Sequence, residues 1–239
     1  MSSIVDILKS STPKYELTLP SSGEIKKFRP FLVKEEKLLL MAKESSSEIE
    51  VIHAVQQLIE SCVEEMENII NLPMFDIEYM YLQLRAKSIG ETVTPKFTCP
   101  KTSETIQTKI NLLDIEVIKT KNHTKKIKIS DDLILHMKYP NISIMENINR
   151  QNKKEEQVPL YNLIVNTIDT IETKEETIDS DIISADEMEN FVGNLTKEQY
   201  EKIIKFFQTS PKLEYEIKYK TKDGKNRKFK LQGLLSFFK

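Results

Sequence analysis

The sequence predicts an α+β fold, in which amphipathic helices and short antiparallel strands occupy separate stretches of the chain. Apolar residues recur at three- and four-residue spacing through residues 47–70 and 76–89, which is the period of a helix face. Apolar and charged residues alternate through 212–220, which is the period of a strand. Asp223-Gly224 then predicts a two-residue hairpin turn before a return strand at 227–231.

Residues 1–90 are predicted to form a hairpin followed by helices. The expected elements are strands 14–19 and 24–28 and helices 34–43, 47–70 and 76–89. Pro30 fixes the chain direction before the first helix, and Gly90 suits the end of the third. In the first helix we expect Leu38, Met41 and Ala42 to share the buried face.

Residues 91–140 are predicted to form a small β subdomain, because short runs of Thr, Val, Ile and Lys alternate there. Its expected hairpins join 93–99 to 105–110 and 125–129 to 133–139. The polar segment 141–157 reads as a linker, and 158–239 as a C-terminal α+β region. That region is expected to hold a helix over 158–170, two short helices opened by the capping boxes Ser184–Glu187 and Thr196–Gln199, and the hairpin described above.

The composition describes a globular chain of 239 residues, with 39% hydrophobic and 30% charged residues. A net charge of −2 gives no general reason to expect nucleic acid or an anionic membrane as a partner. Cys62 and Cys99 form no C-x-x-C pair, which suits a reducing compartment. The first residues do not resemble a signal peptide, and no run is apolar enough to span a membrane, so we expect a cytoplasmic protein.

The sequence shows no signature of catalysis or of cofactor binding. Its five glycines assemble no dinucleotide-binding motif, no phosphate-binding loop and no nucleophile elbow. His53, His123 and His136 lie in three separate segments. Cys99-Pro100 resembles half of a zinc knuckle but lacks a second cysteine pair. We therefore predict no enzyme, no metal and no cofactor.

Two segments carry opposite charge. Residues 169–189 contain nine acids and one lysine, whereas 212–230 contain eight basic residues and three acids. The basic segment could bind single-stranded nucleic acid, because Tyr215, Tyr219 and Phe229 interleave its charges. Alternation in a strand, however, turns the aromatic side chains away from the lysines and into a core. Docking of the two complementary segments on each other, or on partner subunits, is the favoured interpretation.

The apolar end of the chain has two readings. Leu234, Leu235, Phe237 and Phe238 either dock on the protein's own core or form an anchor for a neighbouring subunit. Near the other end, Glu35 and Glu36 fall in the first turn of a predicted helix, where acids favour the helix dipole. We hypothesise that Arg85 pairs with one of these two glutamates, since arginine is rare in this lysine-rich chain.

Three segments together resemble one family. They are Phe28-Arg29-Pro30-Phe31 with the helix start through Leu40, Leu84–Glu91, and the ending Gly233–Phe238. The chain thereby resembles the baseplate hub and hub-assembly proteins of T-even-like contractile-tailed bacteriophages. The resemblance implies a non-enzymatic protein that binds other phage hub and tail proteins in the cytoplasm of the infected cell, either as a chaperone or as a subunit of the virion baseplate.

The candidate interface follows from these segments. Its residues are Phe28, Arg29, Pro30, Phe31, Glu35, Glu36, Lys37, Arg85, Lys87, Leu234, Phe237 and Phe238. Two alternatives from other classes stay open. A single-strand nucleic-acid binder would use the basic C-terminal hairpin, and its association would weaken steeply with salt. A tail-associated hydrolase would need carboxylates or the dispersed histidines to converge in a cleft.

Overall fold

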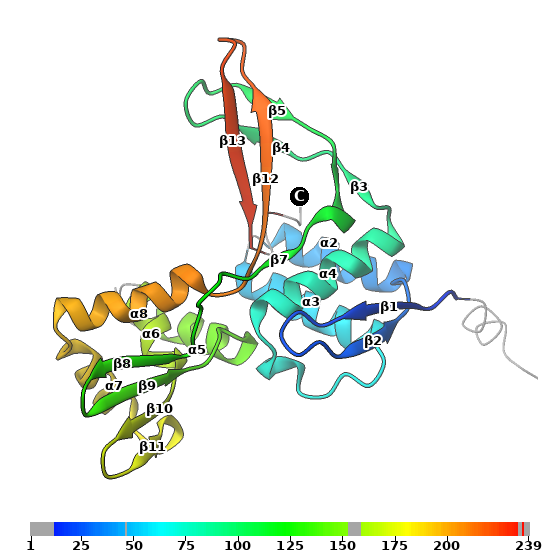
Figure 1. Cartoon of the computed structure of the whole chain (residues 1–239). Helices are drawn as coiled ribbons and strands as arrows, with labels where there is room; N and C mark the ends of the chain where they lie inside the picture. The colour runs from blue at the N-terminus through cyan, green and yellow to red at the C-terminus, as the bar shows by residue number, and fades with distance from the viewer. Residues whose placement is uncertain (1–11, 46, 153–158, 234–235, 237–239) are drawn as a thin grey trace, which may run out of the picture. The chain divides into compact units, whose positions relative to one another are not determined.

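The computed structural model of the protein describes residues 12–45, 47–152, 159–233 and 236. The chain forms two compact units (Figure 1), which are unit 1, from Met1–Ile118 with Lys212–Lys239, and unit 2, from Lys119–Pro211. Helices and small antiparallel sheets occur in both, which confirms the predicted α+β class. The C-terminal hairpin belongs to the same unit as the first part of the chain. The boundaries of the two units therefore differ from the domain boundaries expected at residues 90, 140 and 157.

From residue 12, where the described part of unit 1 starts, the chain forms a hairpin and then three α-helices up to Ser88. Its first elements are β1 (Tyr15–Thr18), β2 (Ile25–Phe28), α2 (Val33–Glu44), α3 (Glu48–Cys62), the 3-10 helix η1 (Ile69–Asn71) and α4 (Met74–Ser88). The helix predicted over 47–70 is shorter than expected, since α3 ends at Cys62. Beyond it, the backbone N–H of Glu64 donates to the carbonyl of Lys27 at 2.8 Å, and Val63 bridges Phe28. The chain leaves the helix there because it pairs with β2.

The remainder of unit 1 surrounds the C-terminal hairpin. Its elements are β3 (Thr92–Val93), β4 (Lys96–Thr98), β5 (Thr105–Gln107), β6 (Ile110–Asn111), the 3-10 helix η2 (Leu112–Asp114), β7 (Val117–Ile118), β12 (Lys212–Lys220) and β13 (Asn226–Gln232). β3 pairs with β6, β4 with β5, and β12 with both β13 and β7. The expected hairpin is therefore present, but its loop has five residues, 221–225, rather than two. The loop is closed where the N–H of Thr221 donates to the carbonyl of Lys225 at 3.1 Å.

One hydrophobic cluster joins α4 to the hairpin. Its buried members are Leu82, Ala86, Ile110, Leu112, Ile115, Leu213, Ile217 and Leu231. The aromatic face of the hairpin packs against β4, where the rings of Phe229 and Phe97 stack with their centroids 4.2 Å apart. Tyr219 meets the same Phe97 ring edge-on at 5.2 Å. The alternating pattern of this hairpin thus turns its aromatic side chains toward the core, as the sequence predicts, although they are only partly buried.

Unit 2 is a four-stranded antiparallel sheet with helices. It contains β8 (Lys126–Ser130), β9 (Leu133–Met137), α5 (Ile142–Asn152), α6 (Pro159–Thr167), β10 (Ile168–Thr173), β11 (Thr177–Asp179), the 3-10 helix η3 (Ser180–Ile182), α7 (Ala185–Gly193) and α8 (Lys197–Thr209). The strands lie in the order β11-β10-β9-β8. The helix predicted over 158–170 ends at Thr167, because Ile168 pairs with Met137 in the sheet.

The segment expected to be a linker contains a helix instead. Asn141 accepts a hydrogen bond from the backbone N–H of Ile144 at 2.9 Å at the start of α5, and Ile142 and Ile148 are buried. The two predicted helix starts at Ser184 and Thr196 are confirmed. Thr196 forms the complete capping box with Gln199, through N–H···O bonds of 3.3 and 2.9 Å.

Candidate protein-binding surface

The site begins where β2 ends, at the guanidinium of Arg29. Its two terminal nitrogens donate to the two carboxylate oxygens of Glu35, at 3.2 Å (Nη1–Oε2) and 2.9 Å (Nη2–Oε1). The same nitrogens donate to backbone carbonyls, those of Pro30 at 3.0 Å and Ser61 at 2.8 Å. This planar fork therefore ties the β2 strand to the first turn of α2 and to the end of α3.

Glu35 has a second role at the start of α2. Its Oε2 accepts the backbone N–H of Leu32, the residue before the helix, at 2.5 Å. Leu32 offers no side-chain oxygen, so only one half of a capping box forms. The Glu35 side chain is 4% exposed. Burial opposes its charge, but the hydrogen bonds from Arg29 and Leu32 outweigh burial and lower its pKa.

The structure corrects the hypothesis that Arg85 is the partner of Glu35 or Glu36. Arg29 makes the pair with Glu35, while Arg85 lies beside Tyr81 within α4. Burial raises the pKa of Tyr81 to about 12, and Arg85 acts in the opposite direction. Sequence spacing did not suggest Arg29 as the partner, because Pro30 intervenes and the approach depends on how the chain turns into α2.

Two of the three segments that carry the resemblance meet in space. The backbone N–H of Phe31 donates to the hydroxyl oxygen of Ser88 at 2.9 Å, and this hydroxyl donates to the carbonyl of Leu84 at 2.6 Å. Lys87 pairs with Glu91 at 2.6 Å and lies over the ring of Tyr15, 5.4 Å from its centroid. Ser88 is absent from the predicted site residues, since nothing in its local sequence distinguishes it.

The predicted interface residues are not equally accessible. Phe28 and Phe31 are buried, whereas Pro30 and Glu36 are half-buried and Lys37 is exposed. The side chains of Phe28 and Phe31 therefore lie in the core beneath the candidate surface and do not themselves face a partner. Leu234, Phe237 and Phe238 lie outside the described residues.

Apolar side chains cover the outer face of α2. Val33 is 83% exposed, Leu40 55% and Met41 58%, and their spacing of seven and eight residues places them on one side of the helix. The inner face is instead formed by Glu35, Leu39 and Ala42. The expectation that Leu38, Met41 and Ala42 turn inward is therefore correct for Ala42 alone. We call Val33, Leu40 and Met41 the outer α2 face.

The histidines and cysteines do not gather into a site. His123 bonds to Thr209 and Tyr139, at 2.9 and 3.0 Å, and His136 to Glu172 at 2.7 Å. Cys99 is buried and accepts a hydrogen bond from the hydroxyl of Tyr219 at 3.3 Å. Throughout the described residues, no group of three or more His, Cys, Asp or Glu side chains could hold a metal ion.

Comparison with known families identifies one match. Residues 12–239 match the family described as T4 bacteriophage base plate protein. Neither the curated proteins nor the solved structures give a match to the chain. Among the described helices, none combines the length and apolar character needed to cross a membrane. Because the match covers nearly the whole sequence, the chain belongs to the T4 bacteriophage base plate protein family.

Proposed function

We propose that this protein is a subunit or an assembly factor of the baseplate hub, and that it works by protein binding rather than by catalysis. The family match supports the baseplate as its setting. The outer α2 face is the observation that supports a binding role. Three large apolar side chains held on one side of a helix are typical of a contact surface.

The chemistry of this face suits an apolar groove on another hub protein. Full burial of one Val, Leu or Met side chain contributes ~1.5–3 kcal/mol. Lys34 and Lys37 are exposed nearby on the same helix, so the partner's groove is expected to carry carboxylates at its rim. An amphipathic helix in a groove is a recurrent mode of recognition.

The pair formed by Arg29 and Glu35 gives this surface its rigidity. It fixes the first turn of α2 to β2 and to the carbonyl of Ser61 before any partner arrives. A preformed helix loses less conformational entropy on binding than a segment that must fold first. The signature residues of the site therefore act as supports, while the apolar residues beside them make the contact.

We further propose that binding takes place in the cytoplasm of the infected cell, while the baseplate is being assembled. A hub subunit would be retained in the finished tail, whereas an assembly factor would be released. Mass spectrometry of purified virions distinguishes these two roles.

Affinity purification of the tagged chain from cells that express the phage hub and tail proteins tests the proposal. We expect hub proteins to copurify with the natural chain, and to be lost with the double variant Leu40→Glu/Met41→Glu. Ile182→Glu is the control, because Ile182 is an apolar residue of unit 2 that is more exposed (78%) than Leu40 (55%) or Met41 (58%). Recovery of no tail protein, or equal recovery with all three chains, would contradict the proposed role.

A further inference from the structure

The outer face of the C-terminal hairpin divides into a neutralised half and a basic half. Near the start of β12, Glu214 pairs with Lys230 at 2.7 Å and with Lys212 at 3.3 Å, and Glu216 pairs with Lys228 at 3.0 Å. The hydrogen bond from Lys230 leads the effects that lower the pKa of Glu214 despite its partial burial. The carboxylates of Glu214 and Glu216 are thus paired with lysines of the hairpin itself.

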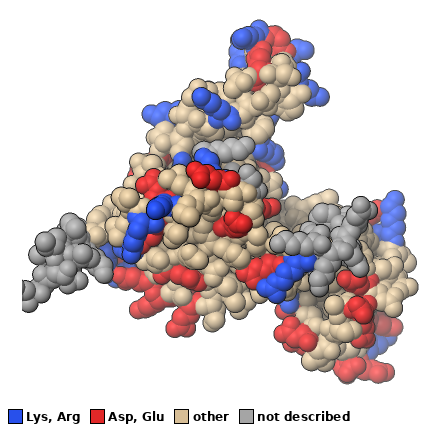
Figure 2. Space-filling view, turned by 180° about the vertical axis from the view of Figure 1, so that it is seen from behind, with Lys and Arg blue, Asp and Glu red and all other residues tan. Residues whose placement is uncertain are grey.

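The far half carries more lysines than acids; beside its loop, the carboxylate of Glu104 accepts the backbone N–H of Lys222 at 3.1 and 3.2 Å. Lys218, Lys220, Lys222 and Lys225 are exposed, and within the described part of the chain none of them forms an ion pair. The one acid in the loop, Asp223, is held by Arg227 at 2.8 Å. We call the four residues the hairpin-end lysines. Figure 2 shows basic side chains surrounding acidic ones at this end of the hairpin.

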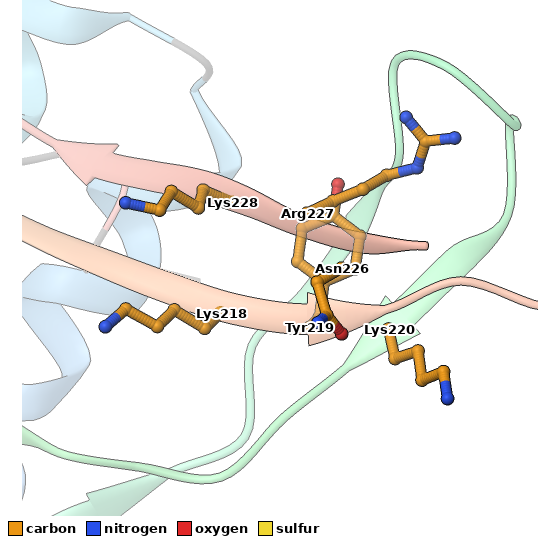
Figure 3. A pocket seen from close by; sticks show the side chains of 6 residues that line it. All are labelled: Lys218, Tyr219, Lys220, Asn226, Arg227 and Lys228. Atoms are coloured by element: carbon orange, nitrogen blue, oxygen red, sulfur yellow. The ribbon is translucent and has the colours of Figure 1, made fainter. Parts of the chain in front are cut away.

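The arrangement of the strands concentrates this charge. Lys218 lies directly opposite Lys228 in the β12–β13 register, and Figure 3 shows their side chains next to each other. Like charges opposite one another on neighbouring strands are destabilising. A shallow hollow runs over the same region, lined by Lys218, Tyr219, Lys220, Asn226, Arg227 and Lys228. Because Lys228 already pairs with Glu216 at 3.0 Å, an anionic ligand bound here would chiefly supply a partner for Lys218.

The aromatic residues of the hairpin are partly buried and packed against the core of unit 1, although Tyr219 also lines the hollow. Phe229 stacks on Phe97, and Tyr219 packs against the same ring while its hydroxyl donates to Cys99. Proteins that bind single-stranded nucleic acid rely on exposed aromatic side chains for base stacking. The hairpin therefore favours carboxylates of a protein surface over a nucleic acid.

A matching acidic surface is present on unit 2. Its residues are Glu175, Glu176, Asp179, Asp181, Asp186 and Glu187, all exposed and, among the described residues, without an ion pair. Other acids of the same segment are occupied, since Glu172 binds Lys126 and His136. Figure 2 shows acidic side chains over this part of unit 2. We call these six residues the acidic surface.

We propose that the hairpin-end lysines of one copy of the chain bind the acidic surface of a second copy. The two surfaces are complementary in charge, and because the whole chain has a net charge of only −2, two copies repel each other weakly. Because the contact joins two different surfaces, it is head-to-tail and can add further copies. Exposed ion pairs are individually weak, so the association depends on several pairs together and on low salt.

Sedimentation velocity of the full chain tests this inference at about 0.1 M and about 1 M NaCl, between which the Debye length falls from ~10 to ~3 Å. We expect self-association at low salt, weakened at least ~10-fold at high salt. The variant Lys218→Glu/Lys220→Glu is expected to be monomeric. The control Lys109→Glu, an exposed lysine elsewhere in unit 1, is expected to associate like the natural chain.

A charge-swap experiment completes the test. Glu175→Lys/Asp181→Lys is expected to be monomeric alone but to associate with Lys218→Glu/Lys220→Glu on mixing, which also shows that both variants are folded. A monomer at both salt concentrations, association that survives charge reversal, or no association of the mixed variants would overturn the proposal. So would preferential binding of the hairpin to a single-stranded oligonucleotide that displaces the second copy.

Discussion

Helices α2 and α8 have similar lengths but distribute their apolar residues differently. In α8, Ile203 and Phe206 are buried, and Tyr200, Ile204 and Phe207 pack around the same core. The outer side of that helix is charged, and its start carries a complete capping box. In α2 the start lacks a side-chain cap, a glutamate is buried, and several large apolar residues are exposed.

We interpret the buried apolar face of α8 as serving the stability of its own unit, and the exposed apolar face of α2 as serving contact with a partner. A helix that serves only its own domain gains by turning apolar residues inward, as α8 does. α2 instead buries Glu35 against Arg29 and leaves Val33, Leu40 and Met41 in water. That distribution contributes little to the stability of the free chain, and we attribute it to binding.

The largest expected effect is on the buried face of α8. Phe206→Ala removes a side chain that is 3% exposed and leaves a cavity, so we expect the free energy of unfolding to fall by ~3–5 kcal/mol. Leu40→Ala on the outer α2 face is expected to change it by less than ~0.5 kcal/mol. Urea denaturation followed by circular dichroism measures both. Equal losses would mean that the outer α2 face packs inside the protein.

The pair that supports α2 comes next. Arg29→Ala leaves the Glu35 carboxylate buried without its partner, and we expect a loss of ~2–3 kcal/mol, toward the low end for buried pairs because Arg29 is partly exposed. Glu36→Ala, at the neighbouring half-buried position, is the control, with an expected change below ~0.5 kcal/mol. If urea denaturation gives the same small change for both variants, Arg29 does not hold the helix.

The start of each helix gives a smaller effect. Thr196→Ala removes the side-chain cap of α8 and should destabilise unit 2 by ~1 kcal/mol. Leu32→Ala at the corresponding position of α2 removes no capping hydrogen bond, so we expect less than ~0.5 kcal/mol. Thermal denaturation of the two variants measures the contrast, and a larger loss for Leu32→Ala would contradict it.

The acid sensitivity of α2 is the subtlest test. Because folding lowers the pKa of Glu35, the resulting stability is fully present above the unfolded value of 4.5 and is lost as the pH falls through the folded pKa. Glu35→Gln should therefore flatten the decline of the urea midpoint below pH 4.5, whereas Glu36→Gln should retain it. An unchanged decline in Glu35→Gln would show that this carboxyl is not held by Arg29.

Much of α8 could be predicted from sequence because its determinants are local. The cap at Thr196, the amide at Gln199 and the apolar spacing lie within a few turns of one helix. α5 carried a comparable signal in Ile142 and Ile148, but the polar residues between them favoured a linker. In that segment the spacing of the isoleucines is a better predictor of structure than the polar composition, because Ile142 and Ile148 are buried in the helix.

The α2 region was harder to predict because its determinants are tertiary. Apolar residues occur on both sides of the helix, so periodicity could not select the buried face. The early end of α3 depends on pairing between Val63 and Phe28, and the contact of Phe31 with Ser88 spans 57 positions. The signature segments pointed to the candidate surface, but only the fold shows that Arg29 pairs with Glu35 at the start of α2 and that Leu40 and Met41 face outward.

Site-specific photo-crosslinking during baseplate assembly tests the central claim most directly. A photoreactive residue placed at Leu40, on the outer α2 face, is compared with one placed at Lys205, an exposed position on α8. We expect position 40 to crosslink to a baseplate hub protein and position 205 to give no such product. A hub crosslink from position 205 with none from position 40 would contradict the assignment of α2 as the binding surface.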